Sequence, residues 1–164
     1  NIIKAARILC DYPIKFVFVG NGPEKNNLME QSKKFNNVFF EEPVPKSEIP
    51  NLISKFDAII VSLRDIPLFR YGVSPNKLYD AYAIGRPVVT TINGAINDEV
   101  EAYKLGVTAP SEDPQKLALS IKKLFFMSRL ERIKISERAR KIAEDVYSRE
   151  RINQKYDQLL KKFL

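Results

Sequence analysis

One stretch in the middle of the chain combines the residue types that a phosphate-binding helix end needs. Ser74 is a favourable N-cap residue, and Pro75 then falls at the first helical position, where its missing N–H costs nothing. The backbone N–H groups of Asn76, Lys77 and Leu78 are therefore expected to point out of a positive helix end. A helix end of this kind suits a phosphate.

A carboxylate follows one turn further along the same predicted helix. Asp80 lies three residues after Lys77 and four after Asn76, so the three side chains share one helix face. Amides and a cation for phosphate, with a carboxylate for a hydroxyl, suit a nucleoside diphosphate. The alternative is an ordinary capped helix on which Lys77 and Asp80 form a surface pair worth about 0.2–0.5 kcal/mol. The spacing favours neither interpretation.

Two loops near the start of the chain also fit a ligand site. The turn Gly20-Asn21-Gly22 follows a β-rich run and lets the backbone come close to a ligand. It is not the GxGxxG fingerprint, and a tight strand-to-helix turn needs glycine in any case, so for this turn taken alone we favour a structural role over a ligand loop. The loop around Val44 is stiffened by two prolines and either meets a flat base or only connects two elements.

The elements that would position these loops alternate along the chain. We expect strands at 15–19, 37–40, 58–62, 87–91 and 107–109. We expect helices at 2–10, 24–34, 47–56, 75–84, 97–104, 114–127, 131–146 and 148–163. This order predicts a single α/β domain with a doubly wound parallel sheet and extra C-terminal helices, whose loops meet at the carboxyl ends of the strands.

Several local expectations accompany this order. Ser47 should cap the short helix at 47–56, and residues 63–73 should form a long loop that carries Arg64, Asp65 and Arg70. For the Asn93-Gly94 turn we favour a plain left-handed turn over a ligand loop.

Composition excludes several classes of chemistry. The 164 residues include no histidine, which removes Ser–His and Cys–His catalysis and disfavours a zinc site. Cys10 is the single cysteine and lies at the end of an apolar helix pattern, so we expect a buried structural thiol. No apolar run approaches the roughly 18 residues that span a bilayer. The chain begins at Asn1 within a helical pattern that lacks a preceding strand, so we expect an excised piece of a longer protein.

The formal net charge of +7 raises the question of nucleic-acid binding. Many of the basic residues fall in the last third of the chain, where they are mixed with Glu and Asp on predicted helices. A solvated helical surface that faces anionic lipid or a partner is the preferred interpretation, and we do not expect nucleic acid as a partner.

Taken together, these motifs resemble the C-terminal, nucleotide-sugar-binding half of GT-B glycosyltransferases. The closest group is family 4, the glycosyl transferases group 1 type that builds bacterial surface polysaccharides. The resemblance runs through the segments 16–23, 37–40, 56–58, 72–89 and 108–114, and through the helix opened by Tyr147-Ser148. The Ser-Pro-Asn-Lys-Leu segment at 74–78 is similar to a subgroup of N-acetylaminosugar transferases of O-antigen and capsule pathways.

The resemblance implies a role for each loop. The glycine turn and the start of the Pro75 helix would hold the donor's diphosphate, and the loop near Val44 would hold the base by its backbone. Asp80 matches the second Glu of the family's E-x7-E pair, which binds the ribose hydroxyls. The first Glu, which lies near the sugar, falls on Gly72, so this chain departs from the pattern at both positions. No catalytic residue is assigned.

The resemblance also implies a reaction. A sugar would pass from a nucleotide sugar, expected to be UDP-linked, to a lipid-linked or saccharide acceptor, with retention of configuration and without a metal or other cofactor. The acceptor domain and the first strand of the donor domain would be absent from this chain, which alone should be inactive. We expect a cytoplasmic location, with at most peripheral association at the inner face of the membrane. The rival interpretation is a non-catalytic nucleotide-binding or scaffold module on the same fold, which the departures at Gly72 and Asp80 favour.

Overall fold

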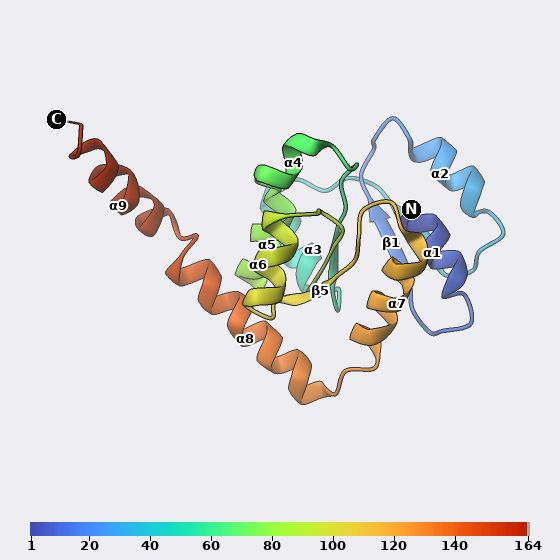
Figure 1. Cartoon of the computed structure of the whole chain (residues 1–164). Helices are drawn as coiled ribbons and strands as arrows, with labels where there is room; N and C mark the ends of the chain where they lie inside the picture. The colour runs from blue at the N-terminus through green and yellow to red at the C-terminus, as the bar shows by residue number, and fades with distance from the viewer. Residues whose placement is uncertain (164) are drawn as a thin grey trace.

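Two parallel sheets lie at the centre of the computed structural model, which describes residues 1–163 (Figure 1). In the first sheet, β1 (Phe16–Val19) pairs with β2 (Val38–Glu41). In the second, β4 (Val88–Thr90) lies between β3 (Ile59–Val61) and β5 (Gly106–Thr108). The predicted α/β class and the parallel strands are confirmed. The expected continuous sheet is instead divided, because no strand among the described residues pairs β1 with β3.

The apolar run at 58–62 forms a strand whose two faces pack into two different cores. Ala58 and Ile60 pack against one cluster of buried side chains, whereas Ile59 and Val61 pack against the other. Alternate residues of a strand point to opposite faces of the sheet, so a strand covered by helices on both sides reads as a continuous apolar run.

Helices cover both faces of the sheets, as a doubly wound fold requires. The first face is covered by α1 (Ile2–Ile8) and α7 (Pro114–Phe125), and the second by α5 (Asn76–Ile84), α6 (Ala95–Ala102) and α8 (Arg129–Asp145). On α5, the side chains of Leu78, Ala81 and Tyr82 are fully buried. Burial of a large apolar side chain such as that of Leu78 contributes roughly 1.5–3 kcal/mol, and it fixes the helix that carries the candidate site.

Both ends of α5 are well defined. The helix starts at Asn76 and stops at Gly85, which adopts a left-handed conformation with φ +73°. A Cβ at Gly85 would lie 2.7 Å from the Ser136 hydroxyl of α8, so the glycine also allows the two helices to approach. The expected glycine stop is confirmed.

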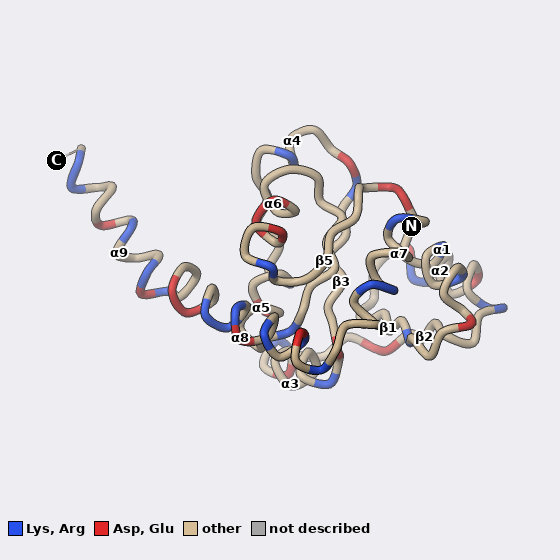
Figure 2. Tube along the Cα trace, turned by 60° about the horizontal axis from the view of Figure 1, so that its bottom comes forward, with Lys and Arg blue, Asp and Glu red and all other residues tan. Residues whose placement is uncertain are grey.

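The remaining helices are short or peripheral. They are α2 (Lys25–Ser32), the 3₁₀ turn η1 (Lys46–Glu48), α3 (Ile49–Ser54), α4 (Pro67–Tyr71) and α9 (Arg149–Leu160). Figures 1 and 2 both show α9 extending away from the body of the molecule, and it has no buried residue. No helix within residues 1–163 is both long and apolar enough to cross a membrane.

Three local predictions are wrong. Ser47 does not cap a helix, because η1 precedes α3 and places Ser47 inside the 3₁₀ turn. The expected loop at 63–73 contains the helix α4, which starts at a proline in its favoured first-turn position. Cys10 is exposed rather than buried, because α1 ends at Ile8 and the chain turns away from the core after Leu9.

Candidate functional site

The start of α5 leaves two backbone amides without a partner in the described part of the chain. These are the N–H groups of Asn76 and Lys77, for which no hydrogen bond forms within residues 1–163. The third expected amide is engaged, because the Leu78 N–H donates to the Pro75 carbonyl at 2.9 Å, and the Leu78 side chain is fully buried. The helix therefore presents two free donors at its positive end, rather than three.

The predicted cap at Ser74 is wrong. Pro75 occupies the N-cap position with an extended backbone (φ −78°, ψ 112°), and no side chain caps the helix. The Ser74 hydroxyl instead donates to the Tyr79 hydroxyl at 3.4 Å. Because the Ser74 hydroxyl is directed to Tyr79, it does not accept from the first amides of the helix, which stay open.

The three polar side chains of the α5 start are exposed. Asn76, Lys77 and Asp80 lie on the solvent side of the helix, opposite the buried Leu78. Lys77 and Asp80 form no ion pair among the described residues, so the surface pair considered for them is not present. Both charges thus remain available to a ligand at this helix end.

The glycine turn after β1 is open to solvent. Gly20 has φ +134°, which favours glycine, and its N–H donates to the Glu41 carbonyl at 3.2 Å. A Cβ built at Gly20 or at Gly22 would meet no atom within 4 Å, and Asn21 is exposed. The backbone of this turn is accessible to a ligand, as the sequence predicts.

An ion pair connects this turn with the loop that carries Val44. Lys25, at the start of α2, lies 2.7 Å from the Glu42 carboxylate in the loop after β2. Val44 is half-buried two residues further on. The structure therefore brings the glycine turn and the Val44 loop to the same edge of the first sheet.

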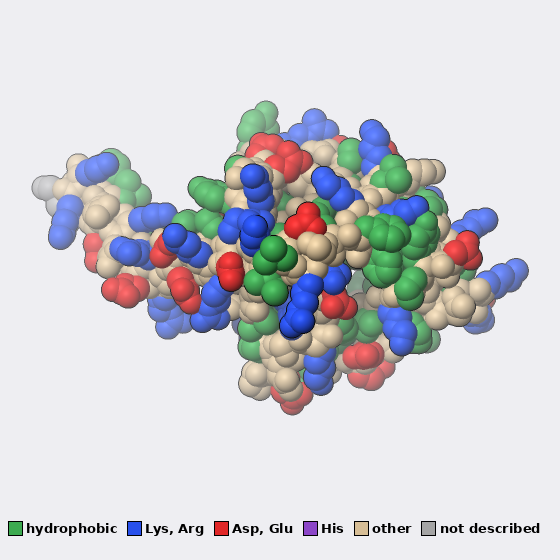
Figure 3. Space-filling view, turned by 90° about the horizontal axis from the view of Figure 1, so that it is seen from below, with side chains coloured by type: hydrophobic (Ala, Val, Ile, Leu, Met, Phe, Trp, Pro, Cys, Tyr) green, Lys and Arg blue, Asp and Glu red, His purple; other side chains and the backbone are tan. Residues whose placement is uncertain are grey.

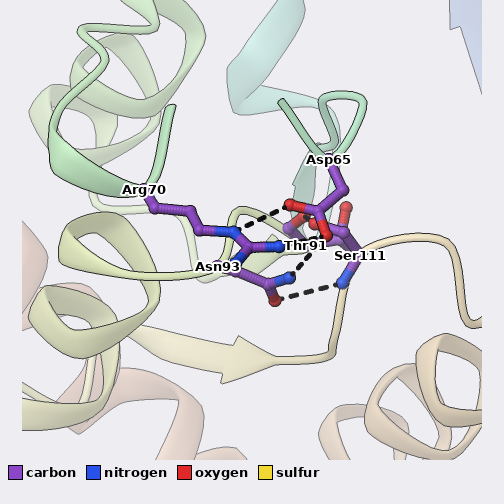
Figure 4. A network of polar contacts seen from close by, with 5 residues as sticks. All are labelled: Asp65, Arg70, Thr91, Asn93 and Ser111. Carbon is purple, nitrogen blue, oxygen red and sulfur yellow. Dashed lines mark hydrogen bonds and ion pairs between the residues drawn. The ribbon is translucent and has the colours of Figure 1, made fainter. Parts of the chain in front are cut away.

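A polar network joins the loops after β3, β4 and β5 (Figure 4). The Arg70 guanidinium donates to both oxygens of the Asp65 carboxylate, at 3.2 and 2.9 Å. The Asn93 amide approaches the same carboxylate at 3.5 Å, and its oxygen accepts from the Ser111 N–H at 3.2 Å. The Ser111 hydroxyl donates to the Thr91 carbonyl at 2.5 Å. We call these five residues the interloop network.

The network holds α4 against the loop after β4. The hydrogen bond to Asp65, and then the charge of its carboxylate, raise the pKa of Arg70 above its ordinary value. Gly94 has φ +91°, and a Cβ there would lie 2.3 Å from the Arg70 carbonyl. With φ +91° and ψ −143°, Gly94 lies outside the left-handed helical region, so the expected left-handed turn is not formed. The absence of a side chain at Gly94 also allows the close contact with α4. Sequence reasoning missed this network, although polar residues follow each of the three strands.

The site residues form two groups rather than one continuous cluster. Gly20, Gly22 and Val44 belong to the edge of the first sheet, while Ser74–Asp80 and the interloop network belong to the edge of the second. All of these loops follow the carboxyl ends of parallel strands, where doubly wound folds bind ligands. No hydrogen bond or ion pair among the described residues connects the two groups.

Gly72 lies between α4 and α5 with room for a side chain. Its backbone is extended (φ 167°), and a Cβ there would meet no atom within 4 Å. The structure thus imposes no steric reason for glycine at the position where the resemblance expects a glutamate.

A cluster of tyrosines packs α5 against α6 and the segment that follows α8. The hydroxyls of Tyr82 and Tyr147 both donate to the Glu99 carboxylate of α6, the first at 3.1 Å. Burial first, and the neighbouring Glu99 carboxylate second, raise the pKa of Tyr82 well above its ordinary value. The ring of Tyr79 packs on that of Tyr147 with centroids 4.7 Å apart.

A cavity of about 370 Å³ opens beside this cluster. Its lining includes Ser74 and Tyr79 of the α5 region together with Tyr147, Ile152 and Lys155 of the α8–α9 region. No group of three His, Cys, Asp or Glu side chains within residues 1–163 could hold a metal ion.

The fold and the site together define a class of protein. Loops gather at the carboxyl ends of parallel strands, and an open helix start offers free amides next to a lysine and a carboxylate, which is the arrangement of a doubly wound α/β domain with an open anion-binding helix end. The chain belongs to the glycosyl transferases group 1 family, whose model matches residues 1–126.

Comparisons with individual proteins agree with the family. The chain is 27% identical to a protein of Escherichia coli (strain K12), provisionally named colanic acid biosynthesis glycosyltransferase WcaL, over 96% of this chain and 40% of that protein. Its fold is similar to that of a glycosyltransferase from Rickettsia africae ESF-5, with a TM-score of 0.78 and 19% identity over 98% of this chain and 43% of that one. It is equally similar to Anabaena Alr3699/HepE, solved in complex with UDP-glucose, with a TM-score of 0.78 and 22% identity over 98% and 44% of the two chains.

These comparisons confirm the resemblance to GT-B glycosyltransferases and their fold. The chain spans about two fifths of the length of the relatives that it matches.

Proposed function

We propose that this chain is the donor-binding half of a GT-B glycosyltransferase and binds a nucleotide sugar, UDP-linked, at the start of α5. The observation that carries the proposal is the open helix end, where the free amides of Asn76 and Lys77 lie beside the exposed Lys77 and Asp80 side chains. The UDP-glucose complex of the Anabaena protein supports a donor of this class, because it shares the fold over nearly the whole of this chain.

In this proposal the diphosphate lies against α5. Two amides and the positive end of the helix attract phosphate oxygens, and the Lys77 ammonium adds a full positive charge. The Gly20-Asn21-Gly22 turn would contact the diphosphate through its backbone from the edge of the first sheet, since no atom lies within 4 Å of a Cβ built at either glycine. Ser74 and Pro75 shape the helix start, and Leu78 anchors it in the core.

In this proposal the nucleoside is held by Asp80 and by the loop that carries Val44. The Asp80 carboxylate accepts hydrogen bonds from the ribose hydroxyls, and the loop at Val44 offers backbone groups and an apolar side chain to the base. No catalytic residue is assigned within this chain.

The chemistry is the transfer of a glycosyl group. The bond from the sugar's anomeric carbon to the β-phosphate oxygen breaks, and a new bond forms to an acceptor hydroxyl, which loses its proton. Negative charge grows on the departing diphosphate, and preorganised amides and a lysine at that place lower the barrier. We propose that the transfer needs no metal or other cofactor and retains the anomeric configuration, with a hexose or an N-acetylaminosugar as the group transferred.

The setting of the reaction is part of the proposal. The name of the Escherichia coli relative supports a role in surface polysaccharide synthesis, with a lipid-linked or saccharide acceptor held by chain outside these residues. We place the enzyme in the cytoplasm, with peripheral association at the inner face of the membrane. The alternative is a non-catalytic nucleotide-binding or scaffold module, favoured by Gly72 and Asp80 at the two positions where the family's glutamates are expected.

Calorimetric titration of the chain with UDP, UDP-sugars and GDP tests the proposal. Asp80→Asn should weaken UDP binding by roughly tenfold or more, because a hydrogen bond to a charged group contributes about 1.5–3 kcal/mol. It should not change the affinity for 2′,3′-dideoxy-UDP, which lacks the ribose hydroxyls. Asp98→Asn, an exposed aspartate in the first turn of α6, is the matched control. If the unaltered chain binds none of the nucleotides, the scaffold alternative is correct.

A further inference from the structure

Most of the net positive charge of the chain falls in two segments of the sequence. Residues 1–15 and 113–134 hold nine Lys and Arg against three Asp and Glu, a formal surplus of six out of the chain's seven net charges. The remaining 127 residues carry a net charge of only +1. The positions of the charged residues can be followed along the trace in Figure 2. Five of the nine basic residues lie on α1 and α7, which pack against each other on the first face of the sheets. Three others, Arg129, Arg132 and Lys134, lie at the start of α8.

Large apolar side chains are exposed in the same place. Leu119, Lys122, Lys123 and Phe126 follow each other at helical spacing along and just beyond α7, so they share one stripe. The side chains of Leu119 and Phe126 are each 65% exposed, although both are large and apolar. The core of α7 lies on its opposite side, and burial in this chain therefore does not explain the stripe.

The end of α1 continues this stripe into a surface. A groove of about 330 Å³ lies between the two helices, and Ile8, Tyr12, Leu119 and Lys122 are among the residues that line it. The rings of Tyr12 and Phe126 meet edge to face with centroids 6.2 Å apart. The Lys122 ammonium lies over the Tyr12 ring, 4.6 Å from its centroid. Figure 3 shows hydrophobic side chains gathered with Lys and Arg around them on this side of the molecule.

We propose that this surface, formed by Ile8, Tyr12, Leu119, Lys122, Lys123 and Phe126, docks the protein on an anionic lipid bilayer. We call it the α1–α7 surface. Aliphatic and aromatic side chains enter the boundary between headgroups and acyl chains, while the lysines meet anionic headgroups. The surplus of positive charge matches the charge of such a membrane, and the exposed leucine and phenylalanine match its apolar layer. A nucleic acid would use the charges but would leave Leu119 and Phe126 exposed to water.

The inference deepens the membrane-side location in the proposed function and does not depend on the donor site. The α1–α7 surface lies on the helices of the first face, whereas the start of α5 lies on the second. Lipid binding and nucleotide binding can therefore be measured separately on the same chain, and either can fail without the other.

The test is sedimentation of the chain with vesicles of phosphatidylcholine alone or with 40% phosphatidylglycerol, at about 0.1 M and 0.5 M salt. We expect binding to the anionic vesicles only, and weaker binding at high salt. The double variant Leu119→Ser/Phe126→Ser should lose most of this binding. Because both side chains are exposed, the thermal transition should change little. The double variant Lys122→Gln/Lys123→Gln should lower the partition coefficient roughly 25-fold, since each basic residue near an anionic surface is worth about fivefold.

Matched variants elsewhere control for composition. Tyr156→Ser/Leu160→Ser removes exposed apolar side chains from α9, and Lys34→Gln/Lys46→Gln removes two exposed lysines near the first sheet. Neither should reduce vesicle binding. The proposal is overturned if the chain does not bind anionic vesicles, if the α9 variant abolishes binding while Leu119→Ser/Phe126→Ser does not, or if the chain prefers RNA to vesicles and the surface variants abolish that binding. Unchanged UDP affinity in the surface variants would keep this result separate from the donor site.

Discussion

Replacement of Lys77 tests whether this lysine supplies positive charge to the diphosphate. Lys77 is the second residue of α5, its side chain is exposed, and it forms no hydrogen bond or ion pair within the described residues. Lys77→Ala should therefore leave the thermal transition unchanged, because the variant breaks no contact of the folded chain. Any effect on nucleotide affinity then reports on the ligand rather than on folding.

The size of the effect follows from Coulomb's law. A unit charge about 4 Å from a phosphate oxygen in a water-like medium contributes about 1 kcal/mol, which is roughly fivefold in Kd. Partial shielding from solvent by the helix end would raise this to roughly tenfold. Lowering the ionic strength from about 0.15 M to about 0.01 M lengthens the Debye length from about 8 to 30 Å, so the ratio between the two proteins should grow.

Calorimetry with UDP at the two ionic strengths measures this ratio. Lys77→Arg should keep most of the affinity, and Lys34→Ala, which removes an exposed lysine distant from α5, should have no effect. Equal UDP affinities for the unaltered chain and Lys77→Ala at low ionic strength would refute the role of Lys77. Equal losses in Lys77→Ala and Lys34→Ala would instead show that only the net charge matters.

Three further predictions concern the support of the site. Gly94→Ala should lower the free energy of unfolding by about 1–3 kcal/mol in urea titrations, since its Cβ would lie 2.3 Å from the Arg70 carbonyl; an unchanged midpoint would show that α4 moves freely. Gly72→Glu should change stability by less than about 0.5 kcal/mol, because its backbone is extended and its surroundings are open; a large loss would contradict that geometry. Burial and Glu99 raise the Tyr82 pKa in the folded state, so the free energy of unfolding should fall above about pH 10, by up to about 1.4 kcal/mol per pH unit. Tyr82→Phe should make this fall less steep, and an equal slope in the variant would show that Tyr82 does not cause it.

The strands and the fold class could be predicted because their patterns have a direct physical cause. The run at 58–62 is apolar throughout since its two faces enter two cores, and the sequence alone shows that it is a buried parallel strand. Asp113 before Pro114 predicts the start of α7, and in the structure its carboxylate accepts from the Lys116 N–H at 2.9 Å.

Helix boundaries were less predictable. We expected a helix from residue 131, but α8 starts at Arg129 under a capping box formed by Ser128 and Glu131. The Ser-x-x-Glu spacing was present in the sequence and would have given the correct start. At α5 the sequence predicts a cap that the structure does not contain, so the helix starts later than expected. Ser74 is a good cap by residue type, but its hydroxyl bonds to Tyr79. Side-chain contacts of that kind are not visible in the spacing.

The interloop network could not be predicted from local patterns. Asp65, Arg70 and Asn93 stood out individually as polar loop residues, but their contacts depend on how α4 folds back over Gly94. The start of α5 is different, because its amides follow from the helix itself, and the lysine and the carboxylate follow from helical spacing. The residues of the candidate site can therefore be predicted from the sequence, whereas the side-chain contacts that hold its loops in place cannot.

Backbone amide shifts during a UDP titration test the central claim most directly. In ¹H–¹⁵N correlation spectra of the chain, we expect the amides of Asn76 and Lys77 to move most, because they are free in the folded chain and would donate to phosphate oxygens. Smaller shifts should follow at Gly20–Gly22 and at Asp80, while the amides of α9 should stay in place. Saturable shifts that spare residues 74–80, or no shifts at millimolar UDP, would contradict a donor site at the start of α5.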